Sequence, residues 1–507
     1  MLRNETRSTE RKAQRASKKA LWQLGSLSKA KLSSAARPAA KSPFEQALQP
    51  AIAIPTETRA ACHFLSNFVL VPRQGSTRGF MDYLLPLLKS EDPDGQLHHA
   101  FNACSLASLA NTSSSSSSGS NSPGTTKTGH TSLVNQAFGE YAKALKATNA
   151  VLRDPDAWKS DTALAAVLLL GVFENITAQE AGAFAWGTHI GAAIQIAGAR
   201  GRRQLRTKIG LQIFISVRTQ CIIHTLTTGK APIMGADWWF QDAVNDPTAA
   251  AVQRLSLKTS ELRAEVTTTM STLSRTPENV ELMRTLMRRA KSLDQDLAAW
   301  MDGLPENWHW KTICWQGPLS EGEYSSAEVF PGRVDVYNDF WIASLVNVGR
   351  TTRLYLGSIT IRCAAWISSP VDYRTTPEYA TVARACADNI SDIIASIPYH
   401  LGWHVKRKDL FENHALSGFA CGEDDSLKGL GGYFLTWPLA AVVSQDYTTD
   451  NQRAYVQGRL RHIADVLGIK YGHILSQVSL VNQFCRGQLS LPTRLIASSS
   501  ESVSRPC

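Results

Sequence analysis

The strongest constraint on the fold is a series of apolar residues at helical spacing, which begins near Thr56 and continues through most of the chain. Apolar side chains three or four residues apart lie on one face of an α-helix, whereas a half-buried strand alternates with a period of two. Helical faces recur at residues 61–69, 134–145, 161–173, 184–196, 211–226 and 376–397. Because alternating stretches and hairpin turns are scarce, the sequence predicts an all-α protein with one large helical domain.

One of these helices carries recognisable signals at both ends. Thr376 fits the N-cap position, and Pro377 fits the first turn, where a missing N–H costs little. Apolar residues then follow at helical spacing up to Ile397. Pro398 predicts the end of the helix, because proline cannot donate the next backbone hydrogen bond.

Composition divides the chain into an arm, a helical domain and a tail. Residues 1–55 form a basic arm and a linker rich in Ser, Ala and Pro, residues 56–490 form the helical domain, and residues 491–507 form the tail. Residues 112–132 include six consecutive serines. Because such a stretch buries too little apolar surface to become ordered, we expect a disordered surface insertion there. Gly, Pro and Trp residues without helical spacing favour a boundary between two lobes near 305–333.

Positive charge is concentrated at the beginning of the chain. The protein has a formal net charge of +10, and residues 1–41 hold eleven Lys or Arg residues against two Glu residues, a local charge of +9. Residues 1–20 are predicted to form a helix with a cationic stripe made of Arg3, Arg7, Arg11, Lys12, Arg15, Lys18 and Lys19. The stripe predicts either a nuclear import signal or contacts with nucleic-acid phosphates, which position a protein without reading sequence.

Composition and cysteine spacing argue against a membrane protein and a secreted, disulfide-rich one. The longest strongly apolar run, residues 163–173, is about half of the ~20 residues that cross a bilayer. No secretory signal is expected, because the basic N-terminus has no apolar core. The nine cysteines are scattered, and no two lie within three residues of each other, so a zinc or redox dithiol motif is excluded. We expect reduced and mostly buried thiols, with Cys62 inside a core helix.

Two groups of residues resemble metal sites but have simpler explanations. His400 and His404 are four residues apart, yet the Glu of a zinc-protease motif is missing, and Tyr399 and Trp403 favour an aromatic packing site. Residues 423–425, Glu-Asp-Asp, resemble the acidic magnesium ligands of terpene cyclases, which are also all-α. The second ligand set of those enzymes is absent, and neighbouring glycines favour a solvated loop.

Phosphate-binding and nucleophile motifs are incomplete. Gly229-Lys230 lacks the preceding glycine of a phosphate loop, and the glycines at 429–432 do not follow a strand, so both are predicted to be turns. No serine lies in a nucleophile elbow, and no cysteine has an activating neighbourhood. We therefore predict no catalytic, metal or cofactor site in this chain and no enzymatic activity.

Short landmarks occur in a fixed order along the helical domain. They lie at residues 141–155, 161–177, 186–201, 335–350, 397–402, 432–439 and 458–460. In this order they resemble the regulatory region of fungal six-cysteine zinc-cluster transcription factors, called the fungal-specific transcription factor domain, over about Ala60 to Leu475. The resemblance implies a nuclear helical domain that receives signals and presents surfaces to the transcription machinery.

Residues 1–13 extend this resemblance. Residues 1–6 (MLRNET) and 11–13 (RKA) are similar to the segment that follows the zinc cluster in that family. The six cysteines that bind two zinc ions are missing, so the resemblance implies that the chain begins just after the cluster and holds no zinc. Sequence-specific DNA binding would then lie outside this chain.

These features leave three classes of function. The resemblance implies a regulator of RNA polymerase II transcription, and relatives of this family often control metabolic gene clusters. Its expected partners are promoter DNA, through non-specific phosphate contacts at most, and the transcription machinery or co-regulators, with homodimers and heterodimers both open and no membrane. The second class is a partner or inhibitor module of an intact factor, without its own DNA reader. An all-α enzyme is the third and least favoured class.

Overall fold

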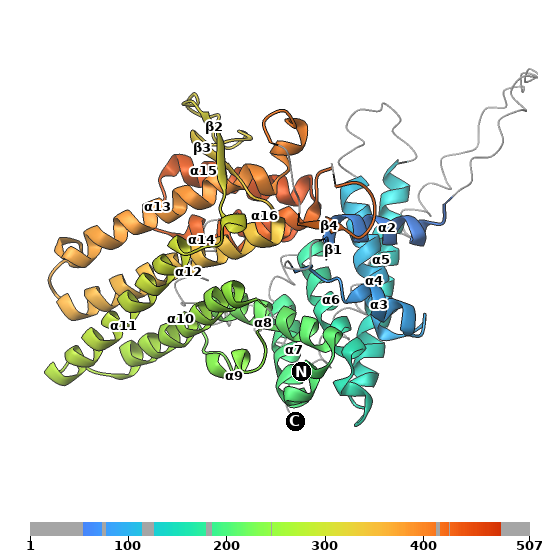
Figure 1. The fold of residues 1–507 in the computed structure, drawn as a ribbon, viewed down its shortest axis with the longest axis horizontal. Coiled ribbons are helices and arrows are strands. Elements are labelled where there is room, and N and C mark those ends of the chain that lie inside the picture. The colour runs from blue at the N-terminus through green and yellow to red at the C-terminus, as the bar shows by residue number, and fades with distance from the viewer. Residues whose placement is uncertain are drawn as a thin grey trace, which may run out of the picture. The chain divides into compact units, whose positions relative to one another are not determined.

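The structure is a computed structural model, which describes residues 54–73, 78–113, 126–178, 185–244, 246–411, 416–424 and 426–477. Helices dominate this part of the chain, and the predicted all-α fold is confirmed (Figure 1). The predicted helix at 1–20, the linker and the tail at 491–507 lie outside the described residues. The helical domain divides into two compact units at Val217 and Arg218, and residues 415–433 and 463–471 belong to the first unit.

The first unit is built around a buried helix. Its helices are α2 (Thr56–Phe68), α3 (Leu84–Ser90), α4 (Gln96–Ser113), α5 (Thr126–Val151), α6 (Asp161–Thr177) and α7 (Ala185–Arg200). Ser160 begins α6, because its hydroxyl accepts the N–H of Ala163 at 3.1 Å, and the residues from Ala163 to Phe173 are all buried. Helix α4 packs against α2, α5 and α6. A two-stranded antiparallel ladder joins β1 (Leu70–Pro72) to β4 (Ser417–Phe419).

The second unit is organised around the long helix α12 (Phe340–Ser368), which packs against α10 (Pro247–Thr272), α11 (Pro277–Asp302) and α13 (Pro377–His400). Asp339 begins α12, because its carboxylate accepts the N–H of Trp341 at 2.7 Å. The strands β2 (Lys311–Gln316) and β3 (Gly332–Val336) pair in antiparallel fashion. The remaining helices are α9 (Ala236–Phe240), most of α14 (Gly429–Ser444) and of α15 (Asp450–Asp465), and α16 (Tyr471–Leu475).

Several sequence expectations are corrected by these bounds. Pro398 does not end α13, which continues to His400, because the helix loses only one hydrogen bond at proline and Leu401 still donates to Ile397. The residues from Thr126 to Ser132 belong to α5 and not to a surface loop, and residues 114–125 lie outside the described part. Residues 305–333 fall within the second unit, where they contribute to the β2–β3 hairpin.

The prediction of a turn at the glycines of residues 429–432 was also wrong, because these glycines lie in the first turn of α14. They allow close packing: a Cβ on Gly429 would lie 2.6 Å from the Phe68 ring, and one on Gly432 would lie 2.8 Å from Leu467. Gly229 does lie in a turn, with φ of +70° immediately after α8 (Lys208–Thr228), as expected for a residue that ends a helix.

The cysteines are mostly but not uniformly buried. Cys104, Cys221, Cys363 and Cys386 are buried, Cys314 and Cys421 are half-buried, and Cys62 is exposed. The expectation for Cys62 was therefore wrong. The buried face of α2 carries Ala60, Phe64 and Phe68, and a residue two positions from Ala60 lies on the opposite face of a helix.

Helix α8 is the one described helix that is long and apolar enough to cross a bilayer by length and composition. Of its most apolar window, 61% is buried inside the fold. Arg218, in the same helix, is 2% exposed and donates to Gln253 and to the backbone oxygens of Trp239 and Ala243. Burial of this kind is typical of a core helix in a globular protein.

Candidate functional site

The landmark residues of the first unit meet in a buried polar network. Tyr141 donates a hydrogen bond of 2.5 Å to Glu174 Oε1, and its oxygen lies 3.1 Å from Nε2 of His189. The Tyr141 ring stacks on Phe173 at a centroid distance of 4.2 Å. Because the Tyr141 proton points to Glu174, His189 donates through Nε2. Burial lowers the pKa of His189 to about 4, so the imidazole is neutral near pH 7.

A second landmark contact joins the beginning of α6 to the end of α7. Asp161 lies in the first turn of α6 and forms an ion pair with Arg200, the last residue of α7. The acidic group thus lies at the positive end of one helix and the basic group at the negative end of another, which is favourable at both places. The side chain of Arg200 is 8% exposed. This pair ties the two helices to each other.

The landmarks of the second unit meet around a buried arginine. Arg350 Nη1 donates to Tyr337 Oη at 2.7 Å, to Asn347 Oδ1 at 3.1 Å and to the backbone oxygen of Asp392 at 3.2 Å. Its Nε lies 3.6 Å from the Asp392 carboxylate, and the guanidinium lies 4.6 Å from the centre of the Trp310 ring. Arg350 has no exposed surface. The arginine therefore ties α12 to α13 and to the residues that flank β2 and β3.

His400 and His404 lie beside this network, in the predicted aromatic packing site. His404 stacks on Tyr399 at 4.8 Å, and His400 Nδ1 lies 3.0 Å from the backbone oxygen of Ser396. Burial lowers the pKa of each histidine to about 4. Within the described ranges, no three His, Cys, Asp or Glu side chains are placed to hold a metal ion. Packing and hydrogen bonding therefore account for this pair.

The acidic stretch at 423–425 is tied to its surroundings. Asp424 forms an ion pair with Arg73 and accepts the N–H of Phe419 at 3.0 Å. Asp425 lies outside the described residues, as do all seven basic residues of the predicted cationic stripe. The cationic stripe therefore stays a prediction.

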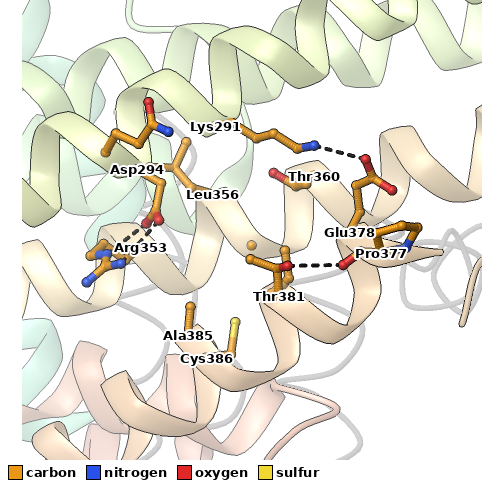
Figure 2. Close-up of a pocket in the computed structure, with 13 residues that line it drawn as sticks. Lys291, Asp294, Arg353, Leu356, Thr360, Pro377, Glu378, Thr381, Ala385 and Cys386 are labelled. Carbon is orange, nitrogen blue, oxygen red and sulfur yellow. Dashed lines mark hydrogen bonds and ion pairs between the residues drawn. The ribbon is translucent and has the colours of Figure 1, made fainter.

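Among the described residues, one open concavity is a pocket between three helices, which we call the three-helix pocket (Figure 2). Helix α12 forms its base, and α11 and α13 form its walls. The volume is about 300 Å³, at the lower end of the range for small-molecule sites. The lining residues are Lys291, Asp294, Gln295, Arg353, Leu356, Gly357, Thr360, Pro377, Glu378, Thr381, Val382, Ala385 and Cys386.

Close packing of α12 against α13 shapes the base of the pocket. A Cβ on Gly357 would lie 2.7 Å from Cys386 Sγ and 3.0 Å from Val382, so only glycine allows this approach. Cys386 is 2% exposed, and burial raises the pKa of its thiol to about 12. The thiol is therefore protonated near pH 7 and contributes apolar surface rather than a nucleophile.

Two ion pairs cross the pocket between helices. Lys291 Nζ of α11 lies 2.9 Å from Glu378 of α13, and Arg353 of α12 holds Asp294 of α11 through two bonds of 2.7 and 3.1 Å (Figure 2). The hydrogen bond to Asp294 raises the pKa of Arg353, and the bond from Lys291 lowers the pKa of Glu378. The four charges cancel, so the pocket suits a small, partly apolar molecule without net charge.

Sequence analysis missed the three-helix pocket. Its residues come from three separate helices, and the sequence pattern of each helix shows which face is buried but not which helix covers it. The available signal was polar residues such as Lys291 and Asp294, which lie three apart on one face of α11. That spacing does not say which helix lies opposite.

Comparison with known proteins gives one partial relative of interest. A stretch of 196 residues, 39% of the chain, is 25% identical to "Transcription factor dbaG" of Emericella nidulans. The aligned stretch spans 44% of that protein, so the chain matches less than half of its length. No family model matches the chain, and no solved structure matches it. The similarity supports a relationship to fungal transcription factors and favours regulation of transcription over catalysis.

Proposed function

We propose that this chain is the regulatory body of a fungal transcription factor and acts in the nucleus. The observation that carries the proposal is the 196-residue similarity to a transcription factor. The all-α fold agrees with it, and so do the landmark residues. They form internal ties such as Tyr141–Glu174 and Arg350–Tyr337 rather than a set of catalytic groups.

The basic residues at 3–19 fit this role. Their charge suits nuclear import or non-specific contacts with DNA phosphates, whose affinity falls with salt at a slope of about −0.9 per phosphate contact. Replacing all seven basic residues with glutamine is expected to reduce that slope in a duplex-binding titration. An unchanged slope together with lost nuclear accumulation would assign the stripe to import alone.

The three-helix pocket supplies a place where a signal could act. An uncharged effector that binds between α11 and α13 would stabilise one arrangement of these helices around α12, and a ligand shifts an equilibrium by its differential affinity for the two states. We infer that the effector is a small molecule with an apolar body and a few polar groups, because apolar side chains and paired charges line the pocket.

The central test is a transcription reporter. The chain is fused to a heterologous sequence-specific DNA-binding domain and expressed in a fungal host with a reporter that carries the matching site. We expect reporter expression to rise or fall several-fold relative to the DNA-binding domain alone. A fusion that is nuclear and folded but leaves the reporter unchanged would contradict the proposal.

A matched pair of variants tests the pocket in the same assay. Ala385→Leu places a larger side chain in the pocket, whereas Arg384→Leu changes the neighbouring exposed residue outside it. We expect Ala385→Leu to lock the reporter response at one level across growth conditions, and Arg384→Leu to behave as the parent chain. Equal behaviour of both variants would remove the pocket from the proposal and leave the transcription role standing.

A second candidate is a module that pairs with an intact factor and lacks a DNA reader of its own. Its basis is that none of the nine cysteines in these 507 residues forms a zinc-cluster motif, so these residues can act without one. Such a module would alter the reporter only when its partner factor is present. Deleting candidate partner factors in the host therefore separates the two proposals.

A further inference from the structure

Two cysteines that are far apart in the sequence lie together at the surface of the first unit. Cys62 is on the exposed face of α2, and Cys421 is half-buried two residues after the end of β4. The two thiols act on each other, because a hydrogen bond with Cys421 is the largest cause that raises the pKa of Cys62. Such a contact places both sulfur atoms where a modest adjustment of side chains would join them.

The backbone explains why they meet. Strand β4 pairs with β1, which follows α2 directly, and the N–H of Ala420 donates to the oxygen of Val69 at 2.9 Å. The next residues then run back along α2. A Cβ on Gly422, where φ is +73°, would lie 3.3 Å from Cβ of Ser66. Ser66 and Cys62 are one turn apart on the same helical face, so the segment that carries Cys421 packs against the face of α2 that carries Cys62.

Further bonds hold this segment against the helix. The Lys428 ammonium group donates to the backbone oxygens of Ser66 at 3.0 Å and Glu423 at 2.6 Å. The N–H of Gly429 donates to Asn67 Oδ1 at 3.2 Å. The approach of the two cysteines is therefore fixed on both sides by contacts that do not involve sulfur.

The other cysteines in the described part of the chain are less suited to reaction. Burial raises the pKa of Cys221, Cys363 and Cys386 to about 12 and raises that of Cys104 further. Cys314 is half-buried, and its raised pKa is caused by burial alone, without a second thiol among the groups that act on it. Cys62 and Cys421 thus combine proximity to each other with access to solvent.

We propose that Cys62 and Cys421 form a reversible disulfide that fastens β4 and the residues after it to α2 when the chain meets a disulfide oxidant such as oxidised glutathione. The Cys62 thiolate attacks one sulfur of glutathione disulfide, breaks its S–S bond and releases one glutathione thiolate. The Cys421 thiolate then attacks the mixed disulfide at Cys62 Sγ and releases the second glutathione. Two electrons pass from the cysteine pair to glutathione, and the two thiol protons end on the two glutathione thiols.

The reaction should depend on pH. The hydrogen bond with Cys421 and, after it, burial raise the pKa of Cys62, so little thiolate exists near pH 7. Because the thiolate is the attacking form, the rate of cross-linking is expected to rise about tenfold from pH 7 to pH 8. The pair therefore stays reduced under mild conditions and oxidises under sustained exposure or at raised pH.

The test uses the full chain and does not depend on a role in transcription. Protein is incubated with glutathione mixtures from fully reduced to fully oxidised, quenched with acid, alkylated and mapped by peptide mass spectrometry. We expect one cross-linked peptide pair, joining Cys62 to Cys421, that disappears on return to reduced glutathione. Cys62→Ser and Cys421→Ser are each expected to abolish the cross-link and leave glutathione attached to the remaining cysteine.

Cys314→Ser is the matched control, because Cys314 is half-buried like Cys421. This variant should leave the cross-link intact. Cys62→Ser changes an exposed side chain, so its fold is expected to survive even if Cys421→Ser perturbs the segment. The proposal is overturned if the parent chain carries glutathione on Cys62 without a cross-link. It is also overturned if oxidation at pH 8 joins a different pair or leaves both thiols free.

Discussion

The two units of the helical domain link their helices through buried polar networks of different chemistry. Each holds a buried polar network that links helices distant in the sequence. In the first unit the network is Tyr141, Glu174 and His189, whose imidazole is neutral near pH 7. In the second unit it centres on Arg350, a guanidinium without exposed surface.

This difference predicts where the molecule is sensitive. In the first unit, Glu174 is only partly buried, so it can bond to water when one hydrogen bond of the network is lost. A fully buried guanidinium is held by Tyr337, Asn347 and Asp392 together, so removing it leaves several oxygens without a donor. We therefore expect the second unit to respond more strongly to single substitutions.

The largest expected effect is that of Arg350→Met. Loss of the buried cation is expected to cost the second unit about 3–5 kcal/mol of unfolding free energy, because Tyr337, Asn347 and Asp392 lose their shared donor. Urea unfolding followed by tryptophan fluorescence measures it, since most of the tryptophans belong to the second unit. The control Arg374→Met removes an exposed arginine that pairs with Asp372 and should leave the transition in place. Equal midpoints for the two variants would refute the central role of Arg350.

The second-largest expected effect is the loss of stability in acid, which should differ between the two units. His400 and His404 in the second unit and His189 in the first each have a pKa of about 4, against about 6.5 when unfolded. Between these values the unfolded chain binds more protons than the folded one, so stability falls as pH is lowered. From pH 7 to pH 5 the loss is about 2 kcal/mol per histidine, hence about 4 kcal/mol for His400 and His404 together.

Hydrogen exchange measured peptide by peptide at pH 7 and pH 5, corrected for the intrinsic exchange rate, resolves the two units. His404→Asn should reduce the acid sensitivity of the second unit only, and His189→Asn that of the first only. If both units lose protection equally in the parent chain, the contrast between the networks does not hold.

The smallest expected effect comes from a matched pair of tyrosine variants. Tyr141→Phe removes the hydroxyl that serves Glu174 and His189 and is expected to cost about 1 kcal/mol. Tyr337→Phe removes the oxygen that accepts from Arg350 Nη1 and should cost more, about 2–3 kcal/mol, because the donor is charged and buried. Thermal unfolding followed by circular dichroism, with each variant compared with the parent, gives the order. A larger loss of stability in Tyr141→Phe than in Tyr337→Phe would mean that the charge of Arg350 does not strengthen the hydrogen bond to Tyr337.

Much of the fold was predictable because helices are local. The spacing of Phe64 and Phe68 and the pair Thr376-Pro377 indicate helices directly, and the structure confirms them. The β2–β3 hairpin was missed because most of β2 is exposed, so its sequence gives no alternating pattern. Trp315 of this strand is 75% exposed. Pro398 misled because proline ends helices in general but is tolerated near the end of a helix that packing holds in place.

The candidate sites were less predictable because they depend on tertiary contacts. The landmarks at Tyr141 and His189 were recognised as separate segments, but nothing local says that their side chains touch. The three-helix pocket requires the order of α11, α12 and α13 in space. The approach of Cys62 to Cys421 requires β4 to pair with β1 across most of the chain.

The ion pair between Lys291 and Glu378 has a consequence for how the pocket opens. It joins the two walls, α11 and α13, and the side chains are 44% and 23% exposed, so dissolved ions can weaken it. Since the charges of the pocket cancel, an uncharged ligand gains nothing from long-range attraction. Dissolved salt would then weaken the Lys291–Glu378 ion pair without weakening any attraction between pocket and ligand. Ligand entry would become faster in high salt, whereas it becomes slower at a site that attracts its ligand by charge.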